Sequence, residues 1–134
     1  MSVSGRIRVE EGSGIKIGNS EVEVEKEINI SGRMEIEKSE IKSEEGISKN
    51  KEEIIRIDGG KIAGGIYINE GKLEIRESEV EGKSYGIRLS KEGDIEIRGS
   101  KVGGETGIEI GENSEIEIGE GVEIKEMEEL MPIL

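Results

Sequence analysis

The chain lacks cysteine, histidine, tryptophan, phenylalanine and glutamine, and several of these absences remove a class of chemistry. Without cysteine it can form neither a disulfide framework nor a thiolate metal site. Without histidine it has no imidazole base to activate a serine nucleophile. Threonine, alanine and proline occur once each, as Thr106, Ala63 and Pro132. Aspartate occurs only at Asp58 and Asp94, so nearly all the negative charge is glutamate.

Positive charge is also scarce, because 19 lysines and arginines stand against 32 acidic residues, a net charge of −13 over 134 residues. Nucleic acids and anionic membranes are bound through lysine and arginine, so we expect neither as a partner. No apolar run is long enough to span a membrane, and the start, MSVSGRIRVE, does not have the pattern of a secretory signal. We expect a soluble protein, cytoplasmic when expressed recombinantly, with no cofactor and no required partner.

A repeat is the main positive feature of the sequence. Each unit starts at an apolar residue, has a second apolar residue two places on, serine or glycine five places on, and another apolar residue seven places on. The units start at Ile15, Met34, Ile55, Leu73, Ile95 and Ile116, and the last drifts so that Val122 and Ile124 straddle the expected position. Further apolar residues, commonly just after a glycine, follow within each unit.

Alternating apolar and polar residues are typical of a β-strand with one buried face. Three short strands per unit, glycine and serine between them, and no helical period predict an all-β fold, a parallel β-solenoid of about six coils. Residues 1–134 then form one domain, with a partial N-terminal coil over 1–14, repeated coils over 15–125 and a C-terminal cap over 126–134. The serines and glycines at the fifth place would line one corner: Ser20, Ser39, Gly60, Ser78, Ser100 and Gly121.

The two ends of the predicted solenoid differ. Near the C-terminus Met127, Leu130, Met131 and Leu134 follow a helical spacing, which predicts a short amphipathic helical cap that Pro132 ends. No comparable pattern precedes the first coil. We expect that end to be a frayed edge or a surface for self-association through the N-terminal coil.

The segments GGIYINEGKLEIRESEVEG, residues 64–82, and YGIRLSKEGDIEIRGSKVGG, residues 85–104, resemble the repeats of the pectin-lyase-like superfamily of right-handed parallel β-helices. The resemblance covers about residues 3–125 and implies a right-handed, single-stranded β-helix. Left-handed β-helices are the alternative, but their coils have a near-constant length, whereas these unit starts lie 18 to 22 residues apart. Enzymes of this superfamily use long loops with clustered aspartate, arginine or lysine. Here the connections are short, so we expect no lyase or hydrolase activity.

Some residues carry a functional reading beside a structural one. Glu74, Glu96 and Glu117 should form one outer column with Lys16, Glu35 and Arg56, either as a carboxylate ladder for a cation or sugar or as a solvated face relieved by Arg76 and Arg98. We favour the solvated face. We also favour a structural role for the serines and a turn for GGETG.

The two tyrosines and one lysine are the remaining candidates. Tyr67 and Tyr85 could stack on a carbohydrate, but two tyrosines are too few for a binding platform. Lys49 stands where other units place isoleucine or leucine. Because a buried lysine is costly, we expect the chain to bulge outward over SKNKEE and return at Ile54 or Ile55.

We therefore assign no catalytic, cofactor-binding or metal-binding residue from the sequence. A restricted alphabet with an Ile, Val and Leu core under a Glu, Lys and Arg surface is typical of a chain selected for folding alone. The leading interpretation is a de novo designed or redesigned structural scaffold without biochemical activity. The alternatives are a natural β-helical carbohydrate-binding or surface protein, and a self-assembling solenoid module.

Overall fold

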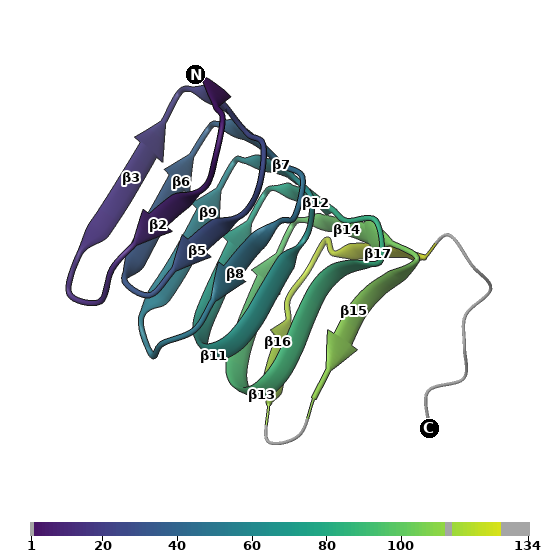
Figure 1. Cartoon of the computed structure of the whole chain (residues 1–134). Helices are drawn as coiled ribbons and strands as arrows, with labels where there is room; N and C mark the ends of the chain where they lie inside the picture. Colours follow the sequence, from purple (N-terminus) through teal and green to yellow (C-terminus); the bar gives the residue numbers. More distant parts are fainter. Residues whose placement is uncertain (1, 112–113, 127–134) are drawn as a thin grey trace.

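The structure is a computed structural model that describes residues 2–111 and 114–126 (Figure 1). That part of the chain contains strands and no helix, and all of its strand pairs are parallel. The chain winds as a parallel β-solenoid of about six turns, as the repeat predicted. The predicted C-terminal cap, with Met127 and the residues that follow it, lies outside the described residues.

The first face of the solenoid is a separate seven-stranded sheet. It receives one strand from each turn, and its buried side chains are those of Val22, Val24, Ile41, Ser43, Ile62, Val80 and Val102. In spatial order it comprises β1 (Ser2–Val3), β4 (Glu21–Val24), β7 (Glu40–Ser43), β10 (Lys61–Ala63), β12 (Glu79–Glu81), β14 (Lys101–Gly104) and β17 (Glu123–Glu126).

The second and third faces share one continuous sheet. The second face contains β2 (Ile7–Val9), β5 (Ile28–Ile30), β8 (Ile47–Lys49), the first halves of β11 (Ile66–Arg76) and β13 (Tyr85–Arg98), and β15 (Thr106–Ile110). The third contains β3 (Gly14–Gly18), β6 (Arg33–Glu37), β9 (Ile54–Asp58), the second halves of β11 and β13, and β16 (Glu115–Ile118).

Three short strands per turn are therefore present in the first three turns, whereas in the next two the second and third strands merge into β11 and β13. These two strands stay paired around the corner, with one register shift between Ile68 and Glu70. Gly71 lies opposite Gly93 at this corner and has a φ of 109°, in the region that favours glycine. A corner built on glycine lets the backbone bend without interrupting the ladder.

The core consists of aliphatic columns, because each turn places its repeat positions on those of the turn below. Ile75 pairs with Ile57 on one side and with Ile97 on the other, and all three are at most 1% exposed. The predicted neighbourhood of Ile75 and Ile97 is thus confirmed. In the last turn the register moves by one residue, so Ile124 rather than Val122 pairs with Val102.

The predicted corner of small residues lies between the third face and the first. The Ser78 hydroxyl donates to the Arg76 carbonyl at 2.7 Å and accepts from the Gly60 amide at 3.0 Å, and the Ser78 amide donates to the Ser100 hydroxyl at 3.1 Å. Just before it Glu77 has a φ of 46°, which turns the chain sharply. The serines therefore join successive turns through the backbone.

Within the described residues the structure contains no helix that is long and apolar enough to cross a membrane.

Candidate functional site

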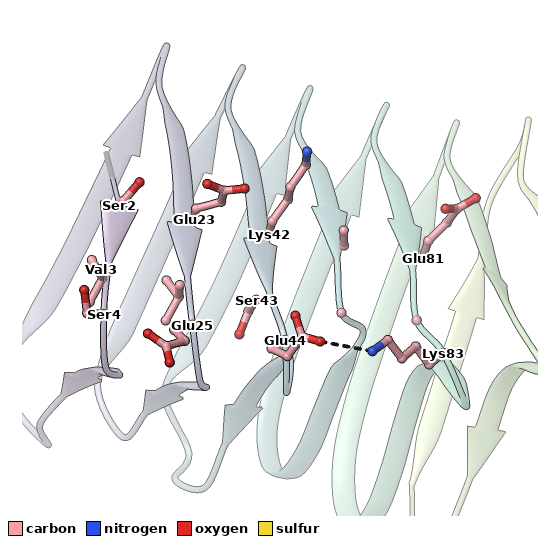
Figure 2. A pocket seen from close by; sticks show the side chains of 14 residues that line it. Ser2, Val3, Ser4, Glu23, Glu25, Lys42, Ser43, Glu44, Glu81 and Lys83 are labelled. Carbon is pink, nitrogen blue, oxygen red and sulfur yellow. Dashed lines mark hydrogen bonds and ion pairs between the residues drawn. The ribbon is translucent and has the colours of Figure 1, made fainter.

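A groove of about 560 Å³ runs along the edge of the first face, where β1, β4, β7, β10 and β12 end (Figure 2). Its lining comes from five successive turns and mixes carboxylates, lysines, serines and small residues. The lining residues are Ser2, Val3, Ser4, Glu23, Val24, Glu25, Lys42, Ser43, Glu44, Ala63, Gly64, Glu81, Gly82 and Lys83.

The groove is hollow because one of its turns carries almost no side chains. Ala63 lies between Lys42 and Glu81 in the sheet register, and Gly64 follows it. Gly64 has a φ of 120°, and a Cβ there would collide with the Ser43 carbonyl, so the backbone itself requires glycine. The only alanine of the sequence and the neighbouring glycines were the signal for this hollow, which sequence reasoning missed.

An ion pair crosses the hollow. The Lys83 Nζ lies 3.2 Å from the Glu44 Oε1, and Figure 2 shows the two side chains meeting over the small turn. Both side chains are well exposed, so the pair adds little to stability. The groove thus offers carboxylates of Glu23, Glu25 and Glu81 beside lysine ammonium groups, a polar lining able to hydrogen-bond a hydroxyl-rich ligand.

The predicted glutamate column is present on the third face. Glu74 lies between Arg56 and Glu96 in the register, and Glu117 follows Glu96. The Arg56 Nε donates to the Glu74 Oε2 at 2.7 Å, and this hydrogen bond is the main cause that lowers the pKa of Glu74. Arg56 also lies 3.9 Å from the Glu35 carboxylate. These contacts support the reading as a solvated, charge-paired face.

The next glutamate of the column is also paired, since the Arg98 guanidinium lies 3.6 Å from the Glu96 carboxylate. Over residues 2–111 and 114–126, no three acidic, histidine or cysteine side chains come together in a group that could hold a metal ion.

The tyrosines of the second face are already in contact with neighbouring groups. The Arg88 guanidinium lies 4.9 Å from the centre of the Tyr85 ring and also 3.0 Å from the Glu109 carboxylate. Tyr67 packs its ring over Gly46, where a Cβ would come within 2.9 Å of the ring. Stacking of a sugar on Tyr85 would therefore have to compete with Arg88.

The prediction that the chain bulges outward at Lys49 is wrong. Lys49 belongs to β8, pairs with Ile30 and Ile68 in a core column, and is 0% exposed. The irregular connection starts after Lys49, at Asn50, and β9 begins at Ile54. The sequence correctly indicated the irregular segment but placed its start too early.

The Lys49 ammonium is accommodated because the side chain reaches the corner beside Gly71. A Cβ at Gly71 would come within 2.6 Å of the Lys49 Cε, so only glycine leaves this space. The Nζ donates to the Lys51 carbonyl at 2.6 Å. Burial lowers the pKa of Lys49 to about 8, and the nearby carboxylates of Glu53 and Glu70 oppose that change.

The described polar groups could hold a neutral, hydroxyl-bearing ligand in the groove or stay paired with one another on the faces. No family model, no curated protein and no solved structure matches this chain.

Proposed function

We propose that this protein is a structural scaffold without catalytic function. The observation that carries the proposal is that the chemically suggestive side chains have partners within the fold. Arg56 holds Glu74, the Ser78 hydroxyl joins two turns, and the Lys49 ammonium donates to a backbone carbonyl. Among the described residues, no buried side-chain nitrogen or oxygen lacks a hydrogen-bond partner. Such complete pairing stabilises one native arrangement.

We further propose that the chain is a de novo designed or heavily redesigned right-handed β-helix similar to the pectin-lyase-like repeats. The restricted alphabet, the strict column pattern and the mixed-charge outer faces support a designed origin. Right-handed winding is supported by the general preference of parallel strand connections for that hand. Electron density from crystals of the protein tests the winding, and a left-handed path would contradict it.

A carbohydrate-binding protein is the second candidate, and the groove of Figure 2 is the observation that favours it. Its width spans several turns, and its lining of carboxylates, lysines and serines could hydrogen-bond sugar hydroxyls. The groove is open and lacks an aromatic side chain among its lining residues, whereas sugar sites gain affinity from stacking on aromatic rings. We therefore rank this function below the scaffold.

Glycan binding distinguishes the two candidates. The full chain is screened on a glycan array, and any hit is followed by calorimetric titration with that oligosaccharide. The titration is repeated with Lys83→Ala, which removes a groove side chain, and with the matched control Lys101→Ala, which lies on the first face outside the groove. The scaffold proposal predicts no saturable binding. Saturable binding that Lys83→Ala weakens and Lys101→Ala preserves would refute it and assign the groove as the site.

A further inference from the structure

The solenoid has sheet edges at both ends. At the N-terminal end β2 and β3 are terminal strands, and as far as residue 126 the other end consists of β15, β16 and β17 (Figure 1). The outer edge of a terminal strand presents backbone amides and carbonyls that can pair with a further strand. The two ends lie at opposite limits of the stack, so one copy could continue another along the same axis.

Among the residues that the structure describes, the last turn leaves core positions partly exposed. Ile110, Ile118 and Ile124 are 45%, 49% and 39% exposed, although each stands in a core column. Their partners one turn earlier, Leu89 and Ile97 among them, are at most 1% exposed. Burying such a half-exposed isoleucine under another turn is worth about 1 kcal/mol or more. As far as residue 126, the columns thus end on apolar side chains that a further turn would cover.

The two ends also differ in charge. Residues 1–24, which include β4, carry Arg6, Arg8 and Lys16 against four glutamates, whereas residues 106–126 carry seven glutamates and one lysine. The first end is thus close to neutral and the last end is strongly acidic. Cations of the first end placed next to glutamates of the last favour a defined orientation of their encounter.

The match extends to single residues when the sheet register is continued by one turn. Placing β2 of a second copy on β15 brings Val9 onto Ile110 and Arg8 next to Glu109. The same column already pairs Arg88 with Glu109 at 3.0 Å between adjacent turns. Placing β3 on β16 brings Lys16 next to Glu117.

The apolar columns continue in the same way. In this register Ile17 of β3 lies on Ile118, and Val22 of β4 lies on Ile124. Each of the three exposed isoleucines of the last turn therefore receives an aliphatic partner from the second copy.

We propose that this protein assembles head to tail, with β2 and β3 of one copy continuing the sheet at β15 and β16 of another. This association has one sense along the axis and does not close on itself, so it produces open filaments rather than a symmetric dimer. The proposal thus identifies the C-terminal end of a second copy as the partner of the N-terminal coil. It does not depend on the scaffold proposal.

One strand has to be displaced in this arrangement. β1 and β17 both belong to the first face, and in the continued register both would pair with β4 of the incoming copy. β1 has only two residues and two register pairs with β4, whereas β17 has four residues. We therefore expect β17 to replace β1, with Glu23 of β4 lying next to Lys125.

Sedimentation velocity of the full chain tests the proposal, from micromolar to millimolar protein in about 0.15 M salt, which limits long-range repulsion to about 8 Å. The expected result is an average mass that rises with concentration. Lys16→Glu should weaken association by about tenfold or more, because it places glutamate next to Glu117. Glu117→Lys should do the same, and the double variant should restore association. Lys101→Glu is the matched control, with the same change in net charge at a residue that lies within the stack, between Glu79 and Glu123, and not on a terminal strand.

Circular dichroism of each variant confirms that the solenoid is folded before its mass is compared. A chain that stays monomeric over the whole range overturns the proposal. So does association that neither Lys16→Glu nor Glu117→Lys weakens, because another surface would then be responsible. Restoration by the double variant, with Lys101→Glu unchanged, is the result that supports the proposed contact. Loss of assembly would leave the scaffold proposal intact, since the glycan titration tests that separately.

Discussion

Replacing Lys49 by methionine removes the one buried ammonium described in the core and keeps a side chain of similar length. Burial lowers the pKa of Lys49 from its ordinary value of 10.5 to about 8. At 1.36 kcal/mol per pKa unit, the charged form costs the folded state about 3 kcal/mol below pH 8. The variant loses the hydrogen bond to the Lys51 carbonyl, which offsets part of this gain. We expect Lys49→Met to be about 1 to 3 kcal/mol more stable at pH 7.

The pH dependence gives an independent test with a defined sign. Between pH 8 and 10.5 the unfolded chain holds the Lys49 proton while the folded chain has released it. The unfolded state then binds more protons, so raising the pH through this window stabilises the folded wild type. The advantage of Lys49→Met should therefore shrink as the pH rises from 8 towards 10.5.

Denaturant unfolding followed by circular dichroism at a series of pH values measures both effects. Lys51→Met is the matched control, because it removes a neighbouring lysine that is exposed and should change stability by less than about 0.5 kcal/mol. In the difference between the unfolding free energies of Lys49→Met and wild type, the contributions from titration of the other lysines and the tyrosines cancel. A variant less stable than wild type at pH 7, or a difference that does not change with pH, would refute the reasoning.

Three further predictions concern the core, the serine corner and the charged face. Ile75→Ala should lower the free energy of unfolding by about 2 to 5 kcal/mol, because it leaves a cavity between two turns, whereas Ile118→Ala in the last turn should cost much less in the same denaturation assay. Ser78→Ala should cost about 1 to 3 kcal/mol, measured likewise, since it leaves the Gly60 amide without its acceptor. Arg56→Gln should raise the pKa of Glu74 towards its ordinary value in an NMR titration, and an unchanged midpoint would show that the pair does not form in solution. Because Arg56 lowers this pKa, any stability that the pair provides is lost as the pH falls through the pKa of Glu74 in the folded protein.

The repeat allowed most of the fold to be predicted, because the core columns depend on spacing rather than on residue identity. Ile57, Ile75 and Ile97 differ in their sequence neighbours, yet their shared position two residues into each unit places them on one another. The serine corner was predictable for the same reason. The merging of strands at β11 and β13 was not, because it depends on φ at Gly71 and on pairing around the corner.

Lys49 and the groove show where sequence reasoning ended. A rule that lysine avoids the core gave the wrong position for Lys49, because the space beside Gly71 exists only once two adjacent turns are stacked, and the Lys51 carbonyl is the acceptor there. The groove likewise depends on the turn at Ala63 and Gly64 lying between turns with longer side chains. Both features arise from neighbours about 20 residues apart in the chain.

Distances between spin labels on one outer column test the stacking of turns most directly, and the absence of cysteine makes specific labelling possible. Glu21, Glu40, Lys61, Glu79, Lys101 and Glu123 follow one another in the register of the first face. With one label at Glu123→Cys and the other at Lys61→Cys, Glu40→Cys or Glu21→Cys, the account predicts separations of about 14, 19 and 24 Å, one strand spacing of about 4.8 Å per turn. Separations that do not increase by a constant step along this series would contradict the stacked solenoid.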